Sequence, residues 1–332
     1  MDTRYAYAVG KIRALESRMI TSSKMEMLAQ VETMDVLIHE LGDTEYADIL
    51  SNSRDAHDLT EKLDNYLCNV YRMLRALSLD PEIIDIFLLA HDIENLKMLL
   101  KAGLNSSEVQ VSPGPKGLFP PEELKQMVQR KNYAGLPALI ADAAVHAPVE
   151  AKKNSDSQLI DIILDKAIYE YAMGVFVKHK NAFLKAVFEK KADLTNIKTF
   201  LRLKMRGKSK EMLGRLLVSG AKIPKDVFLI LYESPAEDLF AKLATSDYGR
   251  LLNKVNDDFK KTGSLSVLET LFDDYILSFI QNAKSTVFGV EALAGYAFGK
   301  EYEVRNLRTI ILAKAYGVNA DSLGRAIRRS YV

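Results

Sequence analysis

The amino-acid sequence predicts an all-α fold. All nine prolines lie before residue 236, so no proline interrupts a helix in the last part of the chain. Over long stretches the apolar residues recur every three or four positions, as on one face of a helix. The one strand-like stretch, VFLILY at residues 227–232, follows Ile223-Pro224-Lys225-Asp226, and a proline in a first turn favours a helix there as well.

Two further helix starts are indicated by residues typical of a first helical turn. Ser23 and Glu26 have the spacing of a capping box, in which two side chains satisfy the free N–H groups of a first turn. In the stretch Pro120-Pro121-Glu122-Glu123, acidic side chains follow prolines, as suits the positive end of the helix dipole. We therefore expect helices to begin at both places.

One pattern occurs three times, as an acidic residue, two further residues, and then Asn-Leu/Ile-Lys/Arg. The copies read DIENLKMLLKAG at 92–103, DLTNIKTFLRLKMRG at 193–207 and EVRNLRTIILAKAYG at 303–317. Around the asparagine of each copy, the apolar residues keep the spacing i, i+3, i+6, i+7, which is the buried stripe of an amphipathic helix. We call these asparagines the repeat asparagines: Asn95, Asn196 and Asn306.

Two landmarks precede each copy in the same order. One is a leucine followed by an acidic residue: Leu63-Asp64, Leu164-Asp165 and Leu268-Glu269. The other is a tyrosine motif, TEYADIL, KNYAGLPALI or SDYGRLL, centred on Tyr46, Tyr133 and Tyr248. The matched order predicts three copies of one helical unit, with boundaries at 1–115, 116–220 and 221–332. Three such units could close into a ring or stack as an open solenoid.

The signature residues of the repeat have structural interpretations. Each repeat asparagine lies at the edge of its apolar stripe, where its amide can reach neighbouring backbone, so we expect an interhelical tie. The repeat acids stand near the start of the expected helix and are predicted to offset its dipole: Asp92, Asp193 and Glu303. The repeat glycines follow the helix and are predicted to stop it: Gly103, Gly207 and Gly317.

No catalytic, cofactor or metal site is indicated. Gly207-Lys208-Ser209 resembles the end of a phosphate-binding loop, but Arg202 stands where the first glycine of that loop is required. The five histidines are scattered, without metal-ligand spacing on one helix face. Cys68 is alone in an apolar helical pattern, which is typical of a small core residue.

The amino-acid composition indicates the cellular compartment and the kinds of partner to expect. A formal net charge of +1 indicates neither a polyanion nor a membrane surface as a general partner. A single cysteine fits a reducing, cytosolic compartment. Charged residues interrupt every apolar stretch, so we expect neither a signal peptide nor a membrane-spanning helix.

Two basic clusters are candidate partner-binding residues. The first cluster, opposed only by Glu211, consists of Lys204, Arg206, Lys208 and Lys210. The second cluster, with no acidic residue after Asp321, consists of Arg325, Arg328 and Arg329. Each cluster could be a solvated helix face or a docking surface, and we favour a protein partner over nucleic acid. A repeat scaffold that binds RNA should carry a basic stripe in every copy, yet LNSSEVQ after Gly103 has no positive charge. A helical enzyme would need a polar cluster drawn from several copies.

The N-terminal YAYAVGKIRALESRMIT, the thrice-repeated helix and the ending EVRNLRTIILAKAYGV…LGRAIRRSYV together resemble the C subunit of the A-type and bacterial V-type rotary ATPases. Its eukaryotic counterpart is the d subunit of the V-type enzyme. The resemblance runs the length of the chain and implies a non-catalytic, all-helical funnel of three similar units around a pseudo-threefold axis. It also implies a place between the D- and F-type shaft subunits and the membrane ring of proteolipid subunits, at the cytoplasmic face of the membrane. There the protein would pass torque for proton or sodium transport, without a cofactor.

Overall fold

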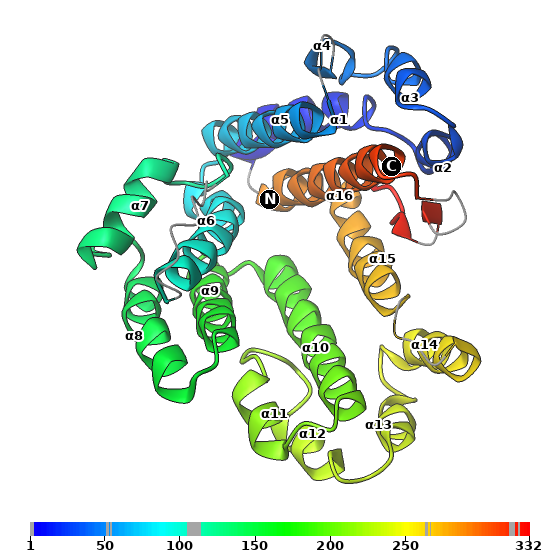
Figure 1. Ribbon diagram of the computed structural model, residues 1–332. Helices are drawn as coiled ribbons and strands as arrows, with labels where there is room; N and C mark the ends of the chain where they lie inside the picture. Colours follow the sequence, from blue (N-terminus) through cyan, green and yellow to red (C-terminus); the bar gives the residue numbers. More distant parts are fainter. Residues whose placement is uncertain are drawn as a thin grey trace. The chain divides into compact units, whose positions relative to one another are not determined.

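The computed structural model describes residues 3–50, 53, 55–104, 114–262, 265, 267–318, 323–324 and 326–332. These residues form sixteen α-helices and two short 3-10 helices, and no strand occurs among them (Figure 1). The predicted all-α fold is confirmed. The chain divides into two compact units, Met1–Ile84 with Asp257–Val332, and Asp85–Asn256. The division into three sequence units stays a prediction.

The first unit combines the two ends of the chain. Its helices are η1 (Thr3–Tyr5), α1 (Ala6–Glu16), α2 (Ser22–Gln30), α3 (Met34–Glu40), α4 (Ala47–Leu50), α5 (Ala56–Leu77), α15 (Leu268–Ile280), η2 (Gln281–Ser285) and α16 (Val290–Ala315). The long helix α16 packs on α5, α1 and α2, so a C-terminal helix forms the core of an N-terminal bundle (Figure 1). Gly299 permits a close approach, because a Cβ there would lie 2.7 Å from Cγ of Tyr331.

The second unit contains the middle of the chain. Its helices are α7 (Pro121–Arg130), α8 (Ala138–Asn154), α9 (Gln158–Lys178), α10 (Ala182–Met205), α11 (Lys210–Leu216), α12 (Lys225–Leu231) and α13 (Ala236–Leu243). Two more helices cross the boundary between the units, α6 (Pro81–Leu104) and α14 (Gly249–Thr262). Helix α9 packs on both α8 and α10. An apolar core of this unit includes Leu96, Ile140 and Leu164.

Two of the three predicted helix starts are confirmed. Helix α7 begins at Pro121, and Pro224 is the N-cap residue of α12, which contains most of VFLILY. The start predicted at Ser23 is wrong by two residues, because the N-cap of α2 is Thr21. Thr21 has the extended backbone of a cap, and its hydroxyl accepts from the Lys24 N–H at 3.3 Å.

Two of the three repeat glycines stop their helices. Gly207 and Gly317 have φ of +59° and +67°, the left-handed conformation that glycine adopts without strain. The following N–H groups, of Lys208 and Val318, reach back to helix carbonyls at 3.0 and 2.8 Å. Gly103 does not stop its helix, because α6 continues to Leu104.

The interpretation of Gly207-Lys208-Ser209 as a stop followed by a restart is confirmed. Ser209 is the N-cap of α11, and its hydroxyl accepts from the Met212 N–H at 3.3 Å. Cys68 is buried in α5, as predicted for a core residue. No helix of the described residues is both long and apolar enough to cross a bilayer.

Candidate functional site

Each repeat asparagine ties its helix to a non-helical segment downstream. Asn196 donates to the carbonyl of Val218 at 3.1 Å and accepts from the N–H of the same residue at 2.7 Å. Asn306 pairs in the same way with Arg328, at 2.8 and 3.0 Å, and Asn95 with Gly114, at 2.9 Å both ways. A carboxamide offers the donor and acceptor of a peptide group, so it satisfies both polar groups of one backbone residue. The tie therefore reaches backbone as predicted, but not the backbone of another helix.

The repeat acids are buried in the middle of their helices. Asp92 and Asp193 have no exposed surface and Glu303 only 3%. They are the twelfth, twelfth and fourteenth residues of helices that begin at 81, 182 and 290, so the prediction that they offset the dipole is wrong. That prediction failed because each helix begins about ten residues earlier than the repeated motif.

Each repeat acid instead accepts the backbone N–H of a residue that leads into a short helix. Leu118 donates to Asp92 at 2.8 Å just before α7, and Ile223 donates to Asp193 at 2.8 Å just before α12. Ile20 donates to Glu303 at 2.7 Å just before α2. The acid thus fixes the entry of a short helix onto the long one. In the third copy that short helix comes from the N-terminal part of the chain.

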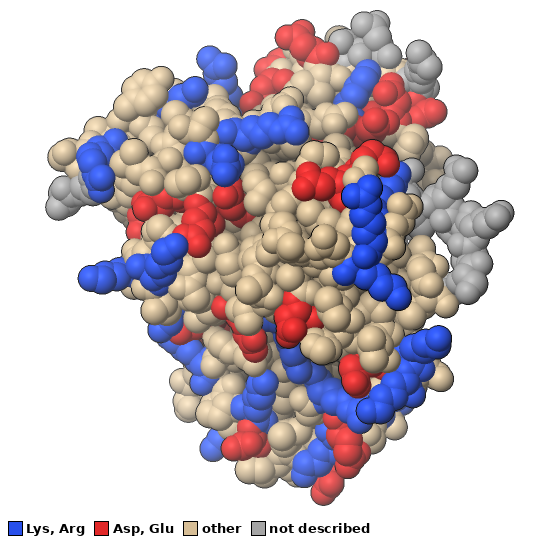
Figure 2. All heavy atoms as spheres, turned by 90° about the vertical axis from the view of Figure 1, so that its left-hand side faces the viewer, with Lys and Arg blue, Asp and Glu red and all other residues tan. Residues whose placement is uncertain are grey.

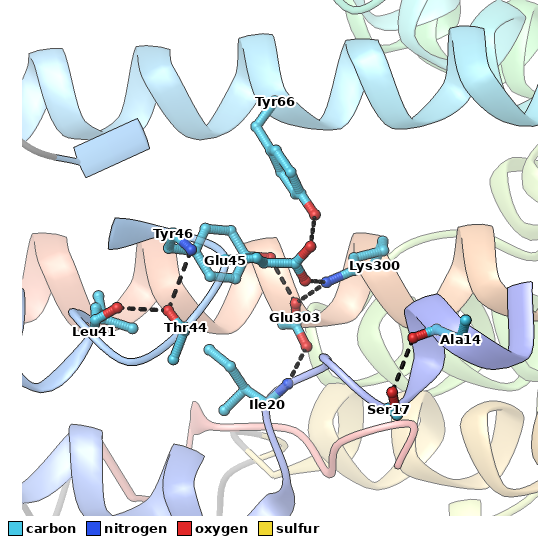
Figure 3. Close-up of polar contacts among 10 residues, drawn as sticks. All are labelled: Ala14, Ser17, Ile20, Leu41, Thr44, Glu45, Tyr46, Tyr66, Lys300 and Glu303. Carbon is cyan, nitrogen blue, oxygen red and sulfur yellow. Dashed lines mark hydrogen bonds and ion pairs between the residues drawn. The ribbon is translucent and has the colours of Figure 1, made fainter. Parts of the chain in front are cut away.

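Glu303 belongs to a buried network of charges and phenols (Figure 3). The Tyr46 hydroxyl donates to Glu303 at 2.6 Å, and the fully buried Lys300 ammonium lies 2.5 Å from the same carboxylate. Lys300 also pairs with Glu45, which accepts from the Tyr66 hydroxyl at 2.7 Å. Burial raises the pKa of Glu303, and the positive charge of Lys300 acts against that rise.

Helix α10 carries a second version of this network. Tyr248 donates to Asp193 at 2.6 Å, and Lys190 pairs with Asp247 at 2.8 Å. The lysine again stands three residues before the repeat acid, and its partner again directly precedes the tyrosine of the tyrosine motif. The lysine also lies over the tyrosine ring in both copies, 5.5 Å from the centroid in the second and 5.4 Å in the third. The two copies are therefore the same device, which we call the lysine–tyrosine network.

The first copy lacks the lysine–tyrosine network. Leu89 stands at the lysine position, and Asn132 precedes the tyrosine in place of an acidic residue. Oδ1 of Asp92 has no hydrogen-bond partner, and it lies so close to Gly117 that a Cβ there would be 1.7 Å away. Burial raises the pKa of Asp92 to about 7, against hydrogen bonds from backbone N–H groups that lower it.

The basic residue of the Asn-Leu/Ile-Lys/Arg motif pairs with the acidic residue of the Leu-acid landmark. Lys97 lies 2.6 Å from Asp165, and Arg308 lies 2.5 Å from Asp64. In these two copies the pair joins a repeat helix to a helix of another sequence copy, α6 to α9 for Lys97 and α16 to α5 for Arg308. The basic residue and the acidic residue are both visible in the sequence. Their pairing could not be predicted from one copy, because the two partners lie in different copies.

Lys204, a predicted partner-binding residue, binds this chain's own backbone. Its ammonium lies 2.5 Å from the carbonyl of Tyr232, at the end of α12. Lys314, at the same position of the third copy, donates to the carbonyl of Ala29 at 2.9 Å, near the end of α2. In both copies the lysine donates to a carbonyl near the end of a short helix, where the last carbonyls lack partners within the helix.

The other predicted binding residues differ in their surroundings. Arg206 and Lys208 are exposed after α10, and Lys210 is half-buried in the first turn of α11. The guanidinium of Arg328 pairs with Asp273 at 3.0 Å, whereas the side chain of Arg329 is 70% exposed. Arg325 lies outside the described residues. On the face drawn in Figure 2, basic and acidic side chains are interspersed.

The described residues contain no group of three or more His, Cys, Asp or Glu side chains that could hold a metal ion. The repeat acids, the most deeply buried carboxylates, are used to hold backbone. The repeat residues thus serve packing, and the exposed basic residues Arg206 and Lys208 follow the end of α10.

Comparison with known proteins gives consistent matches over nearly the whole chain. The sequence model of a family described as ATP synthase (C/AC39) subunit matches residues 8–326. The C subunit of the V-type sodium ATPase of Enterococcus hirae is 26% identical over 322 residues, covering 96% of this chain and 97% of that protein. The C subunits of the A-type ATP synthases of Thermococcus kodakarensis and Methanocaldococcus jannaschii are 25% and 24% identical, covering 93% and 96% of this chain and 86% and 85% of theirs.

Proposed function

Because the chain belongs to the ATP synthase (C/AC39) subunit family, we propose that it joins the central shaft of a V/A-type rotary ATPase to the membrane ring of proteolipid subunits. In this role it turns with the shaft and transmits torque, while other subunits bind ATP and carry the ions. It reaches the cytoplasmic face of the membrane through the complex. The observation that carries the proposal is the family match from residue 8 to residue 326.

The repeated packing supports a part that keeps its shape under load. Each described repeat helix is held to its surroundings by an asparagine tie and a buried carboxylate, and two of them also by a buried lysine–tyrosine network. Fully satisfied buried polar networks hold one arrangement of the chain, because every alternative leaves a polar group unpaired. No catalytic residue is needed for such a role.

The tyrosine motif links sequence copies within each compact unit. The tyrosine of the third copy, Tyr248, binds the acid of the second copy. Tyr46, from the first copy, binds Glu303 of the last, so this contact joins the two ends of the sequence within one unit.

We retain, as the proposed contacts with partner subunits, the basic residues that are not engaged with this chain's own backbone or with Asp273. Arg206, Lys208 and Lys210 come first, and Arg329 with Arg325 second. Lys204 binds the carbonyl of Tyr232, and Arg328 pairs with Asp273. We propose that these two residues hold the neighbouring basic residues in place.

The test is affinity purification from detergent-solubilised membranes with the tagged protein. We expect recovery of the shaft subunits and the proteolipid ring. The variant Arg206→Glu/Lys208→Glu should recover less of one neighbour. Arg250→Glu/Lys254→Glu, which changes the same two charges at exposed positions of α14, is the matched control. Absence of shaft and ring subunits, under conditions that keep the complex intact, would reject the proposed role.

A further inference from the structure

A groove opens beside the first repeat helix, between the end of α6, α7 and α8. Its volume is about 420 Å³, within the range of roughly 300–1,000 Å³ typical of ligand-binding clefts. Its lining is mostly apolar and includes Leu100, Leu104, Val128, Val145 and Val149. We call it the α6–α8 groove.

The groove lies where the first copy departs from the other two. Gly103 occupies the position at which Lys204 and Lys314 reach across to a short helix. A Cβ at Gly103 would meet no atom of the described residues within 4 Å. In this copy the backbone caps the end of α7, since the Asn132 N–H donates to the Met127 carbonyl at 3.0 Å.

Two apolar side chains of α8 are left in water along the groove. Val145 is 49% and Val149 60% exposed, and they stand on successive turns of the helix. Exposed valines at this spacing match the way an amphipathic helix lies in a groove, with apolar contacts every three or four residues. Burying such surface is favourable by about 25 cal/mol per Å².

Two positive charges complete the lining. Lys131 caps the end of α7, Lys152 is in the last turn of α8, and both are exposed. Among the described residues, no acidic side chain lines the groove. An occupant with acidic residues beside an apolar stripe is therefore complementary in charge as well as in polarity.

We propose that the α6–α8 groove is the docking site for an amphipathic helix of a partner protein. Apolar side chains of that helix enter between Leu104, Val145 and Val149, and its flanking acidic residues pair with Lys131 and Lys152. The site goes beyond the proposed role in coupling shaft and ring. The first two experiments use the isolated full chain, so failure of the site there would leave that role untouched.

The first experiment uses a fluorescein-labelled, alanine-based helical peptide with leucines at i, i+4 and i+7 and glutamates beside them. Fluorescence anisotropy with the full chain should show saturable binding. A peptide with lysines in place of the glutamates should bind at least tenfold more weakly. Lys131→Glu/Lys152→Glu should reverse this preference. Equal binding of the two peptides, or no effect of the charge reversal, would overturn the proposal.

The second experiment fills the groove from position 103 without changing its charge. Gly103→Met adds an uncharged side chain of about the length of lysine and should weaken binding of the glutamate peptide at least tenfold. Gly103→Ala is the matched control, since it adds only a Cβ, which meets no described atom within 4 Å, and should bind as the unchanged protein does. Circular dichroism checks that both variants are folded. Undiminished binding to folded Gly103→Met would place the peptide elsewhere and refute the site.

The third experiment identifies the natural occupant in the purified complex. A photo-cross-linking residue at Val149 should label a helical segment of a partner that carries acidic residues beside an apolar stripe. The same residue at Val177, which is also 60% exposed, should not label that segment. Cross-linking to residues 105–113 of this chain, to a second copy of it or to no protein would contradict the proposal.

Discussion

The first repeat helix, α6, and the other two, α10 and α16, share one layer of polar contacts and differ in a second. All three have the asparagine tie and a buried acid that holds a backbone N–H. Only α10 and α16 add the buried lysine, its acidic partner and the tyrosine hydroxyl.

The parts of the second layer are present together in two copies and absent together in the first. A buried ammonium is tolerated only with nearby carboxylates, because desolvating an unpaired charge is very unfavourable. Where the lysine is replaced by Leu89, the acidic partner is replaced by Asn132 and the acid keeps an unpaired oxygen. The first layer persists in all copies because it satisfies backbone groups that every copy has.

The largest expected effect comes from removing the acid of a complete network. Glu303→Ala leaves the buried Lys300 with Glu45 as its one remaining carboxylate, and removes the acceptor of Tyr46 and Ile20. Breaking a buried charge pair in this way costs about 3–5 kcal/mol. Urea unfolding followed by circular dichroism measures the loss.

Asp92→Ala is the matched variant in the first copy. It removes the acceptor of a backbone N–H but strands no buried lysine, so we expect a loss of about 1–3 kcal/mol. Equal losses for the two variants would contradict the distinction between the copies.

The second prediction concerns pH. The folded-state pKa of Asp92, about 7, lies above its ordinary value of 3.8, and the nearby negative charge of Glu123 adds to the effect of burial. The protonated carboxyl is therefore favoured by folding, and its contribution is complete below about pH 4 and is lost as the pH rises to about 7.

Asp92→Asn removes this titration and keeps an acceptor for Leu118. Its free energy of unfolding, relative to the unchanged protein, should rise between pH 4 and 7 by at most about 4 kcal/mol and then level off. Urea unfolding at a series of pH values measures the difference. A pH-independent difference between the two proteins would show that Asp92 does not titrate in this range.

The third prediction tests the layer that all copies share. Replacing a repeat asparagine by alanine leaves a buried N–H and a carbonyl unpaired, which costs about 1–3 kcal/mol. Asn196→Ala and Asn306→Ala should lose similar amounts of unfolding free energy, since both asparagines are fully buried and tie one backbone residue in two directions. A large loss of unfolding free energy in one variant and none in the other would show that the two asparagines are not equivalent.

The smallest effects are expected at the lysine that caps a neighbouring helix. Lys314→Met removes one hydrogen bond to a carbonyl and should destabilise by about 1 kcal/mol. At the same position of the first copy, Gly103→Ala should stabilise by up to about 1 kcal/mol, since alanine favours a helix interior. Thermal melting of the two variants should therefore shift in opposite directions.

The sequence predicted the all-α fold class, because helical periodicity is a local property. Proline entry at Pro121 and glycine stops at Gly207 and Gly317 are also local, and they were found. The roles of the repeat acids were missed. Their partners lie 26 and 30 residues downstream in two copies, and at the other end of the chain in the third.

The lysine–tyrosine network could have been suspected from the sequence. A lysine stands three residues before the acid in two copies, and TEY and SDY both place an acidic residue before tyrosine, while KNY does not. What no single pattern revealed is that the tyrosine of one copy binds the acid of the copy before it. That order follows from the three-dimensional packing, and it makes Tyr46 a partner of Glu303 across most of the chain.

The coupling role is tested most directly by ATP-driven ion uptake into vesicles that contain the reconstituted complex, prepared with and without this protein. The account predicts that ATP hydrolysis persists without the protein while ion uptake is lost, and that adding the protein back restores uptake. Ion uptake at an unchanged rate in its absence would contradict the proposal that torque passes through this protein.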